Sequence, residues 1–223
     1  MMPMKKALFA ILLVAGCSSG GGQSGTSAET EFETKIATSI AFDPALLRQG
    51  DRVVYFVKRL GETQTQKYTW AVVSDEGAAL WIENNFPYEA GRVISKTKID
   101  RSGTVLEQWV GEPGGIPGQR YNSAQAGPPP KPVRDSNAAK ADSKEEPDRI
   151  VVGGKSYDCT RVTTVLTYPD GRKSTMVNWF SREVPFAASK TLGGLVKRQF
   201  GRLTMELVVG DRSAKSELQI PPK

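Results

Sequence analysis

The stretch at residues 157–181, YDCTRVTTVLTYPDGRKSTMVNWFS, decides the fold. Both of its halves are rich in β-branched and aromatic residues, a composition typical of strands. Between the halves stands Pro169-Asp170-Gly171, and Asp-Gly readily adopts the positive φ angles of a tight turn. Because parallel strands need a long crossover, so short a turn joins antiparallel neighbours. The stretch therefore predicts an antiparallel β-hairpin.

Similar runs lie on both sides of this hairpin. Val53, Tyr55 and Val57 alternate with other side chains in residues 51–60, which is the pattern of a half-buried strand. Further runs of this kind are found at residues 68–72, 79–82, 93–99, 105–110, 150–152 and 203–209. About nine strands at hairpin spacing predict a mainly β fold, a curved antiparallel sheet or incomplete barrel with one or two short helices. A β-sandwich is the alternative.

The clearest interruption of the strand pattern is at residues 112–148. Seven of the 14 prolines of the chain lie there, and Tyr121 is the only aromatic residue. Such a composition cannot offset the entropy cost of ordering the chain. We therefore expect a Pro-rich disordered insertion within a single β-rich domain at residues 29–209, followed by a C-terminal tail at residues 210–223.

Helix signals are few. Asp43-Pro44 is typical of a helix N-cap followed by proline in the first turn, and Gly50 marks the stop. The four-residue spacing of apolar side chains favours a short amphipathic helix over residues 29–40. Two consecutive glycines favour a loop or short turn at residues 189–200, leading into a strand.

The first residues carry an export signal. Lys5 and Lys6 supply positive charge, and the apolar run ALFAILLVA follows at residues 7–15. This run is too short to cross a bilayer, which takes about 20 residues. It ends in VAGC at residues 14–17, a motif that resembles the lipobox of bacterial lipoproteins.

The resemblance implies that residues 1–16 are a signal peptide and that Cys17 receives a diacylglycerol and a further fatty acid such as palmitate. The Gly/Ser-rich residues 17–28 then form a lipidated flexible tether. Ser18 stands where an aspartate would retain a lipoprotein at the inner membrane. We therefore expect a bacterial cell-envelope protein, lipid-anchored at the outer membrane and facing the periplasm.

Composition excludes several kinds of chemistry. The chain has 30 basic and 24 acidic residues and no histidine. Without histidine, Ser-His-Asp and Cys-His catalysis are impossible and a zinc site lacks its usual ligand. We expect no enzymatic activity, no metal, no cofactor and, because no Lys/Arg cluster is present, no nucleic-acid partner. With Cys17 lipidated, Cys159 can form no intramolecular disulfide, and we expect it to face the core. A reactive thiol or an intermolecular bridge is the alternative.

Large aromatic side chains are the best candidates for a ligand site. If several line one concave side of the sheet, they would form a pocket for an acyl chain or another apolar ligand. The candidate lining residues are Trp70, Trp81, Trp109, Trp179 and Tyr157. Alternatively, the same side chains simply fill the core.

The second β region adds a resemblance. It contains GKSYDC at residues 154–159, VNWFS at 177–181, VPF at 184–186 and GLVK at 194–197. This series is similar to the C-terminal half of bacterial envelope proteins that resemble the lipoprotein-carrier fold, an incomplete antiparallel barrel around an apolar cavity. The resemblance implies a half-barrel that binds a lipid or apolar ligand. The alternative is a structural or assembly lipoprotein that docks an envelope protein.

The lipid anchor can be tested directly. Cys17→Ala should abolish labelling by a radioactive fatty acid and release the protein into the soluble fraction, because this thiol is the acylated atom. Cys159→Ala should keep both the label and the membrane association. Labelling that survives Cys17→Ala would contradict the lipobox interpretation.

Overall fold

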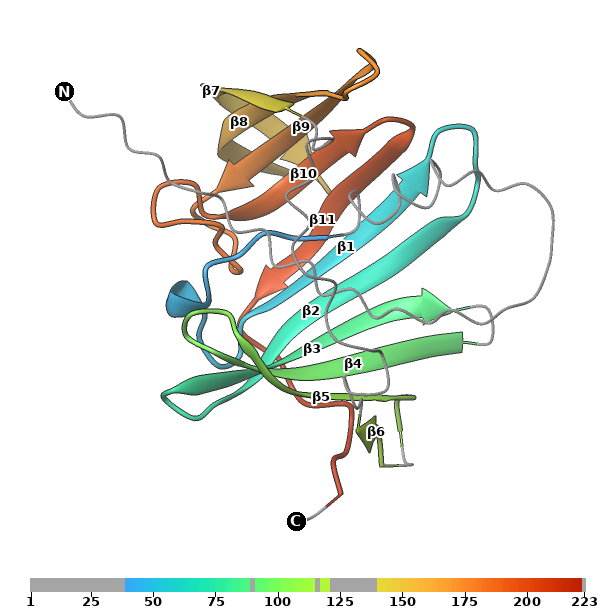
Figure 1. The fold of residues 1–223 in the computed structure, drawn as a ribbon, viewed down its shortest axis with the longest axis vertical. Coiled ribbons are helices and arrows are strands. Elements are labelled where there is room, and N and C mark those ends of the chain that lie inside the picture. Colours follow the sequence, from blue (N-terminus) through green and yellow to red (C-terminus); the bar gives the residue numbers. More distant parts are fainter. Residues whose placement is uncertain (1–38, 89–90, 115–116, 121–139, 222–223) are drawn as a thin grey trace.

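The computed structural model describes residues 39–88, 91–114, 117–120 and 140–221, and this part of the chain is built almost entirely of strands. A single sheet of 11 strands is ordered β6-β5-β4-β3-β2-β1-β11-β10-β9-β8-β7, with every pairing antiparallel (Figure 1). The strands are β1 (Arg52–Arg59), β2 (Thr65–Asp75), β3 (Ala79–Tyr88), β4 (Gly91–Asp100), β5 (Val105–Gly111), β6 (Gln119–Arg120), β7 (Lys140–Val152), β8 (Lys155–Thr167), β9 (Lys173–Ser181), β10 (Gly194–Phe200) and β11 (Leu203–Asp211).

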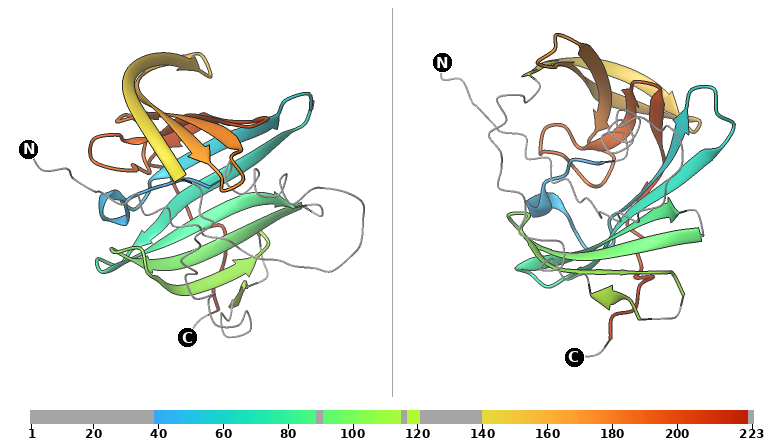
Figure 2. Two further views of the ribbon diagram at one scale, coloured as in Figure 1. Left: turned by 45° about the horizontal axis from the view of Figure 1, so that its top comes forward. Right: turned by 45° about the vertical axis from the view of Figure 1, so that its right-hand side comes forward.

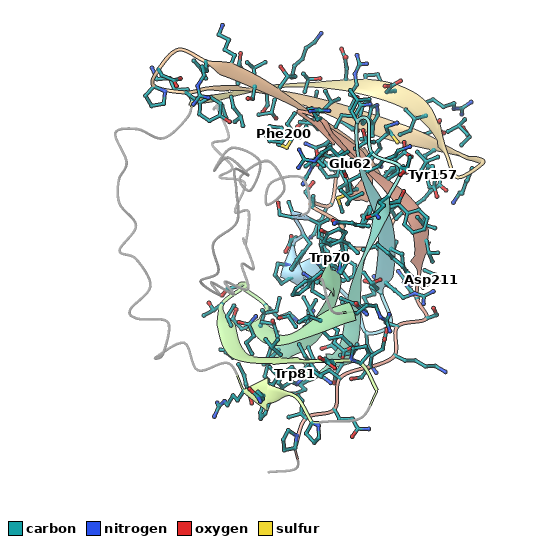
Figure 3. The ribbon with its side chains drawn as sticks, turned by 90° about the vertical axis from the view of Figure 1, so that its right-hand side faces the viewer. Glu62, Trp70, Trp81, Tyr157, Phe200 and Asp211 are labelled. Atoms are coloured by element: carbon teal, nitrogen blue, oxygen red, sulfur yellow. The ribbon has the colours of Figure 1, made fainter. Side chains whose placement is uncertain are left out.

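The sheet is strongly curved and does not close. Its terminal strands, β6 and β7, lie at opposite ends of the order and do not pair with each other. Seen from the side, the sheet forms an open arc, with Trp81 and Tyr157 towards its two ends and Trp70 between them (Figure 3). The expected curved sheet or incomplete barrel is therefore confirmed, and the β-sandwich alternative is not what the chain forms.

The arc consists of two consecutive meanders of five strands, β1–β5 and β7–β11 (Figure 2). They join where the first strand of one pairs with the last strand of the other, β1 with β11. Each meander places a Trp–Lys–Glu triplet across its last three strands, in directly opposed positions: Trp81–Lys98–Glu107 and Trp179–Lys197–Glu206.

The core lies at the junction of the meanders. Tyr55 on β1 is fully buried, and its hydroxyl donates to the carbonyl oxygen of Leu195 on β10 at 2.8 Å. Its ring packs edge-on against Trp70, with centroids 5.7 Å apart. Burial raises the pKa of the Tyr55 phenol far above its ordinary value, so the hydroxyl remains a donor at any physiological pH.

The segment before β1 closes one side of this core. A short 3₁₀ helix, η1 (Pro44–Leu46), follows Asp43, whose carboxylate accepts from the Ala45 amide at 3.0 Å. The expected N-cap and proline turn are therefore confirmed. Phe42 packs edge-on against Phe186, which belongs to the loop that follows β9, and the two ring centroids are 5.7 Å apart. This contact connects the first described segment to the second meander.

Strand β7 begins within the stretch that we expected to be irregular, because it starts at Lys140. Its charged residues and Pro147 are compatible with a strand at the edge of a sheet, where a missing amide donor is tolerated and charge opposes edge-to-edge pairing. The short strand β6 lies in that stretch as well, so two parts of the insertion that we expected to be disordered are strands. Residues 115–116 and 121–139 of the stretch lie outside the described residues, as do the signal peptide, Cys17, the tether and most of the expected helix over 29–40. Within the described ranges, none of the helical segments is long and apolar enough to cross a membrane.

Removing the Tyr55 hydroxyl should weaken the junction. Tyr55→Phe leaves the Leu195 carbonyl buried without its donor, and we expect the free energy of unfolding to fall by about 1–3 kcal/mol. Tyr68→Phe is the matched control, since that hydroxyl bonds only the exposed Gln66 side chain; its effect should stay within about 0.5 kcal/mol. Urea unfolding followed by circular dichroism measures both. Equal effects would contradict a special role for the Tyr55 bond.

Candidate functional site

The five predicted aromatic residues do not surround one cavity. Trp70 is opposite Asn84 on β3, so the two share a face, whereas Trp81 is on the other face of β3. Trp109 lies opposite Lys96 on β4, on the same face as Trp81. This face, opposite to that of Trp70, is the outer face of the first meander. The Trp81 indole donates to the Glu76 carboxylate and the Trp109 indole donates to the Glu107 carboxylate, each at 2.8 Å.

The other two candidates, Trp179 and Tyr157, belong to the second meander. Together with Trp70 they are members of one buried core cluster. The Trp179 indole donates to Asp148 Oδ2 at 2.8 Å, and the Lys155 ammonium lies 4.6 Å from the Tyr157 ring centroid. The structure therefore brings three of the five residues into the core and leaves two on the opposite face of the first meander.

Beside Trp70, the same face carries a ladder of polar side chains. Asn84 is opposite Ser95, and Gln108 Nε2 donates to Ser95 Oγ at 2.8 Å. The side-chain oxygen of Asn84, Oδ1, is buried and accepts no hydrogen bond from the described residues. A buried acceptor without a donor is a cost to the fold, so this position is able to receive a donor from elsewhere.

A pocket that opens to solvent, hereafter the cavity, lies at the other end of the core. It has a volume of about 500 Å³, within the range of about 300–1,000 Å³ that small-molecule sites occupy. It is located between the β7–β8 pair and the loop that connects β9 to β10. Its lining consists of Pro147, Asp148, Asp158, Cys159, Thr160, Phe180, Ser181, Arg182, Glu183, Thr191 and Leu192.

The cavity has an apolar floor. Phe180 and Cys159 belong to the core cluster, and Leu192 packs against it. None of the five predicted aromatic residues lines the cavity; Trp179 reaches it only through its bond to Asp148. Sequence reasoning missed this site because its walls come from a strand end and an irregular loop. The one available signal was the VNWFS strand end, which contains Phe180.

Paired charges of both signs surround the floor. Asp158 bonds the Arg149 guanidinium at 2.7 Å, which lowers the pKa of the Asp158 carboxyl. Glu183 pairs with the Lys155 ammonium at 3.0 Å. Arg182 adds a further positive charge to the lining. An apolar floor with a mixed-charge rim suits an amphipathic molecule whose polar end carries both signs.

Cys159 is a buried free thiol, which confirms that it faces the core. Burial, and to a lesser extent the neighbouring carboxylates with Asp148 first among them, together raise the pKa of this thiol to about 11. At neutral pH the group is therefore a thiol and a poor nucleophile. Among the described residues, no group of three or more His, Cys, Asp or Glu side chains is placed to hold a metal ion.

Arg198 on β10 is a second buried ionisable group that sequence reasoning did not single out. Its Nε donates to Asn178 Oδ1 at 2.6 Å, and its Nη1 donates to the backbone oxygen of Ser39. Burial lowers the pKa of the guanidinium to about 10, so it stays charged at neutral pH. Arg198 thus connects β9, β10 and the segment that precedes η1. Nothing distinguishes it in sequence from the other basic residues.

No protein-family model and no curated protein sequence matches the chain. Solved structures that are similar to it in shape include the following three. A Bacteroides fragilis protein described as exported, with a YmcC-like fold, aligns at a TM-score of 0.36 and 10% identity over 75% of this chain and 97% of its own.

MucB aligns at a TM-score of 0.40 and 12% identity, over 87% of this chain and 66% of MucB. A DUF1329 family protein from Desulfovibrio piger aligns at 0.28 and 12% identity, over 71% and 82% of the two chains. At these TM-scores the likeness carries no inference about activity or ligand.

The state of the thiol can be measured. In the Cys17→Ala chain at pH 8, iodoacetamide should alkylate native Cys159 about a hundredfold more slowly than the urea-unfolded chain, because far less thiolate is present at a pKa near 11 than at the ordinary value of about 8.5. Mass spectrometry over time gives both rates. Equal rates in the two states would contradict the buried, protonated thiol.

Proposed function

We propose that the protein is a lipid-anchored envelope protein that holds an amphipathic ligand, with the apolar part of the ligand in the cavity beside Cys159. The observation that carries the proposal is the cavity of about 500 Å³, which combines a floor continuous with the core and a rim of paired charges. The anchor at Cys17 would hold this cavity close to a membrane surface.

The ligand class follows from the lining. Phe180 and Leu192 offer apolar surface to an acyl chain, whose burial is favourable by roughly 25 cal/mol per Å². Arg182 and Glu183 offer opposite charges at the rim, matching the phosphate and ammonium of a zwitterionic headgroup such as phosphatidylethanolamine. The aromatic core around Trp70 then acts as the support of this site.

A non-catalytic role agrees with the chemistry of the lining. The Cys159 thiol is protonated at neutral pH, and the sequence holds no histidine to activate it. The carboxylates Asp158 and Glu183 are each paired with a cation. These groups are arranged to bind and orient a ligand.

Filling the cavity should abolish binding. Thr191 is exposed and lines the cavity, so Thr191→Trp would occupy it without changing a buried residue. The matched control is Thr63→Trp in the exposed β1–β2 turn. All three proteins carry Cys17→Ala, which releases them into the soluble fraction. Native mass spectrometry after purification from the native periplasm should show a lipid on the protein without a cavity substitution and on the control, and at least a tenfold loss in Thr191→Trp.

Uptake of fluorescent phosphatidylethanolamine should follow the same order. The proposal fails if the protein without a cavity substitution repeatedly carries no ligand and takes up no lipid. It also fails if folded Thr191→Trp binds lipid as well as Thr63→Trp does, because the ligand would then lie elsewhere.

A further inference from the structure

The C-terminal segment, residues 213–221, binds in a groove on the outer face of the first meander. It leaves the end of β11 and runs towards β6 (Figure 1). The described residues of this segment form no strand with any neighbour. The groove is lined by Glu83 on β3, Lys96 on β4, Gly111 at the end of β5, and Gly118.

Two buried charged side chains bind the main chain of the segment. The Glu83 carboxylate accepts from the amides of Glu217 and Leu218, at 2.8 and 3.2 Å. The Lys96 ammonium donates to the Leu218 carbonyl at 3.1 Å. Glu83 and Lys96 are only 4% and 9% exposed. Main-chain contacts of this kind fit any extended peptide.

Only two side chains of the segment are recognised closely. The Ser216 hydroxyl donates to Glu83 Oε1 at 2.5 Å and accepts from Lys96 Nζ at 2.6 Å. Leu218 is 2% exposed and packs on two glycines. A Cβ at Gly111 or Gly118 would lie 2.7 or 3.0 Å from a Leu218 methyl, so the pocket depends on both glycines.

Two main-chain hydrogen bonds complete the contacts of the segment: the Ala214 amide donates to the Gly50 carbonyl and the Gly118 amide donates to the Gln219 carbonyl, each at 2.9 Å. Glu217 and Gln219 are exposed, and the ion pair between Glu217 and Arg92 is long, at 3.4 Å, between half-exposed side chains. One buried side chain and separate hydrogen bonds fix the segment, without a strand ladder. Such segments detach by local opening while the sheet stays folded. Glu83 and Lys96 form a buried ion pair, and such a pair is weak evidence for a stabilising role. We therefore interpret the two side chains as groups that recognise the main chain of a bound segment.

We propose that this groove is a docking site for an extended segment of a partner protein with a Ser-X-Leu core, and that the C-terminal segment is its displaceable resident. The chemistry of the resident defines the partner: an extended backbone, a hydroxyl at the Glu83–Lys96 pair and a leucine two residues later. This inference is independent of ligand binding in the cavity, which is formed by the other meander.

The experiment uses the full-length chain in detergent and a fluorescent peptide of residues 213–223, SAKSELQIPPK. Leu218→Ser in the chain weakens the resident, so fluorescence anisotropy should show the peptide binding this variant at least tenfold more tightly than the wild type. Leu60→Ser, at a residue that is 72% exposed, is the matched control and should bind as weakly as the wild type. Adding Glu83→Gln to the Leu218→Ser chain should reduce binding at least tenfold.

A peptide with serine in place of its leucine should not bind. If Leu218→Ser loses the β signal in circular dichroism, the milder Leu218→Ala takes its place. Folded variants that do not bind the peptide, or that bind both peptides equally, would overturn the proposal. A concentration-dependent wild-type dimer that the peptide does not dissociate would also overturn it, because the groove would then belong to a second copy.

Discussion

The pairing of β1 with β11 is the constraint on which the rest of the structure depends. It joins residues far apart in sequence, as the Arg52–Asp211 ion pair at its end shows, with a separation of 159 residues and a distance of 2.6 Å. Closing so long a loop costs entropy, and the buried core at the junction must offset that cost. Without this pairing, the core side chains that the two meanders bury around Tyr55 would be exposed. Neither the cavity nor the groove would then have a rigid support.

Local patterns in the sequence predicted most of the strands for a physical reason. Alternation over residues 51–60 and the Pro-Asp-Gly turn are properties of neighbouring residues, and the structure has strands and a turn there. The pairing of β1 with β11 has no local signal, because it depends on which sheet edges find each other. The early start of β7 was missed for a related reason, since an edge strand tolerates the charges and the proline that made residues 140–148 look irregular.

The candidate sites were harder to predict than the fold. The sequence identified Trp70, Trp81 and Trp109 as large side chains but did not show which of them share a face of the sheet. The register of the strands decides this, and it places Trp81 and Trp109 on one face and Trp70 on the other. The cavity depends on the loop between β9 and β10, whose course follows from tertiary contacts such as Phe42 with Phe186. Glu83 and Lys96 are ordinary surface charges in sequence, and only the C-terminal segment that covers them reveals their environment.

The two proposed binding functions belong to different meanders. We propose that the second meander holds an amphipathic ligand and that the first docks an extended peptide on its outer face, while the shared core supports both. The most direct test of the central claim is photo-crosslinking of the wild-type protein with a diazirine-bearing phosphatidylethanolamine. We expect adducts on the cavity lining, at Phe180 and at Thr191–Leu192. Adducts confined to the face around Trp70, or no labelling above that of the exposed Leu60 turn, would contradict it.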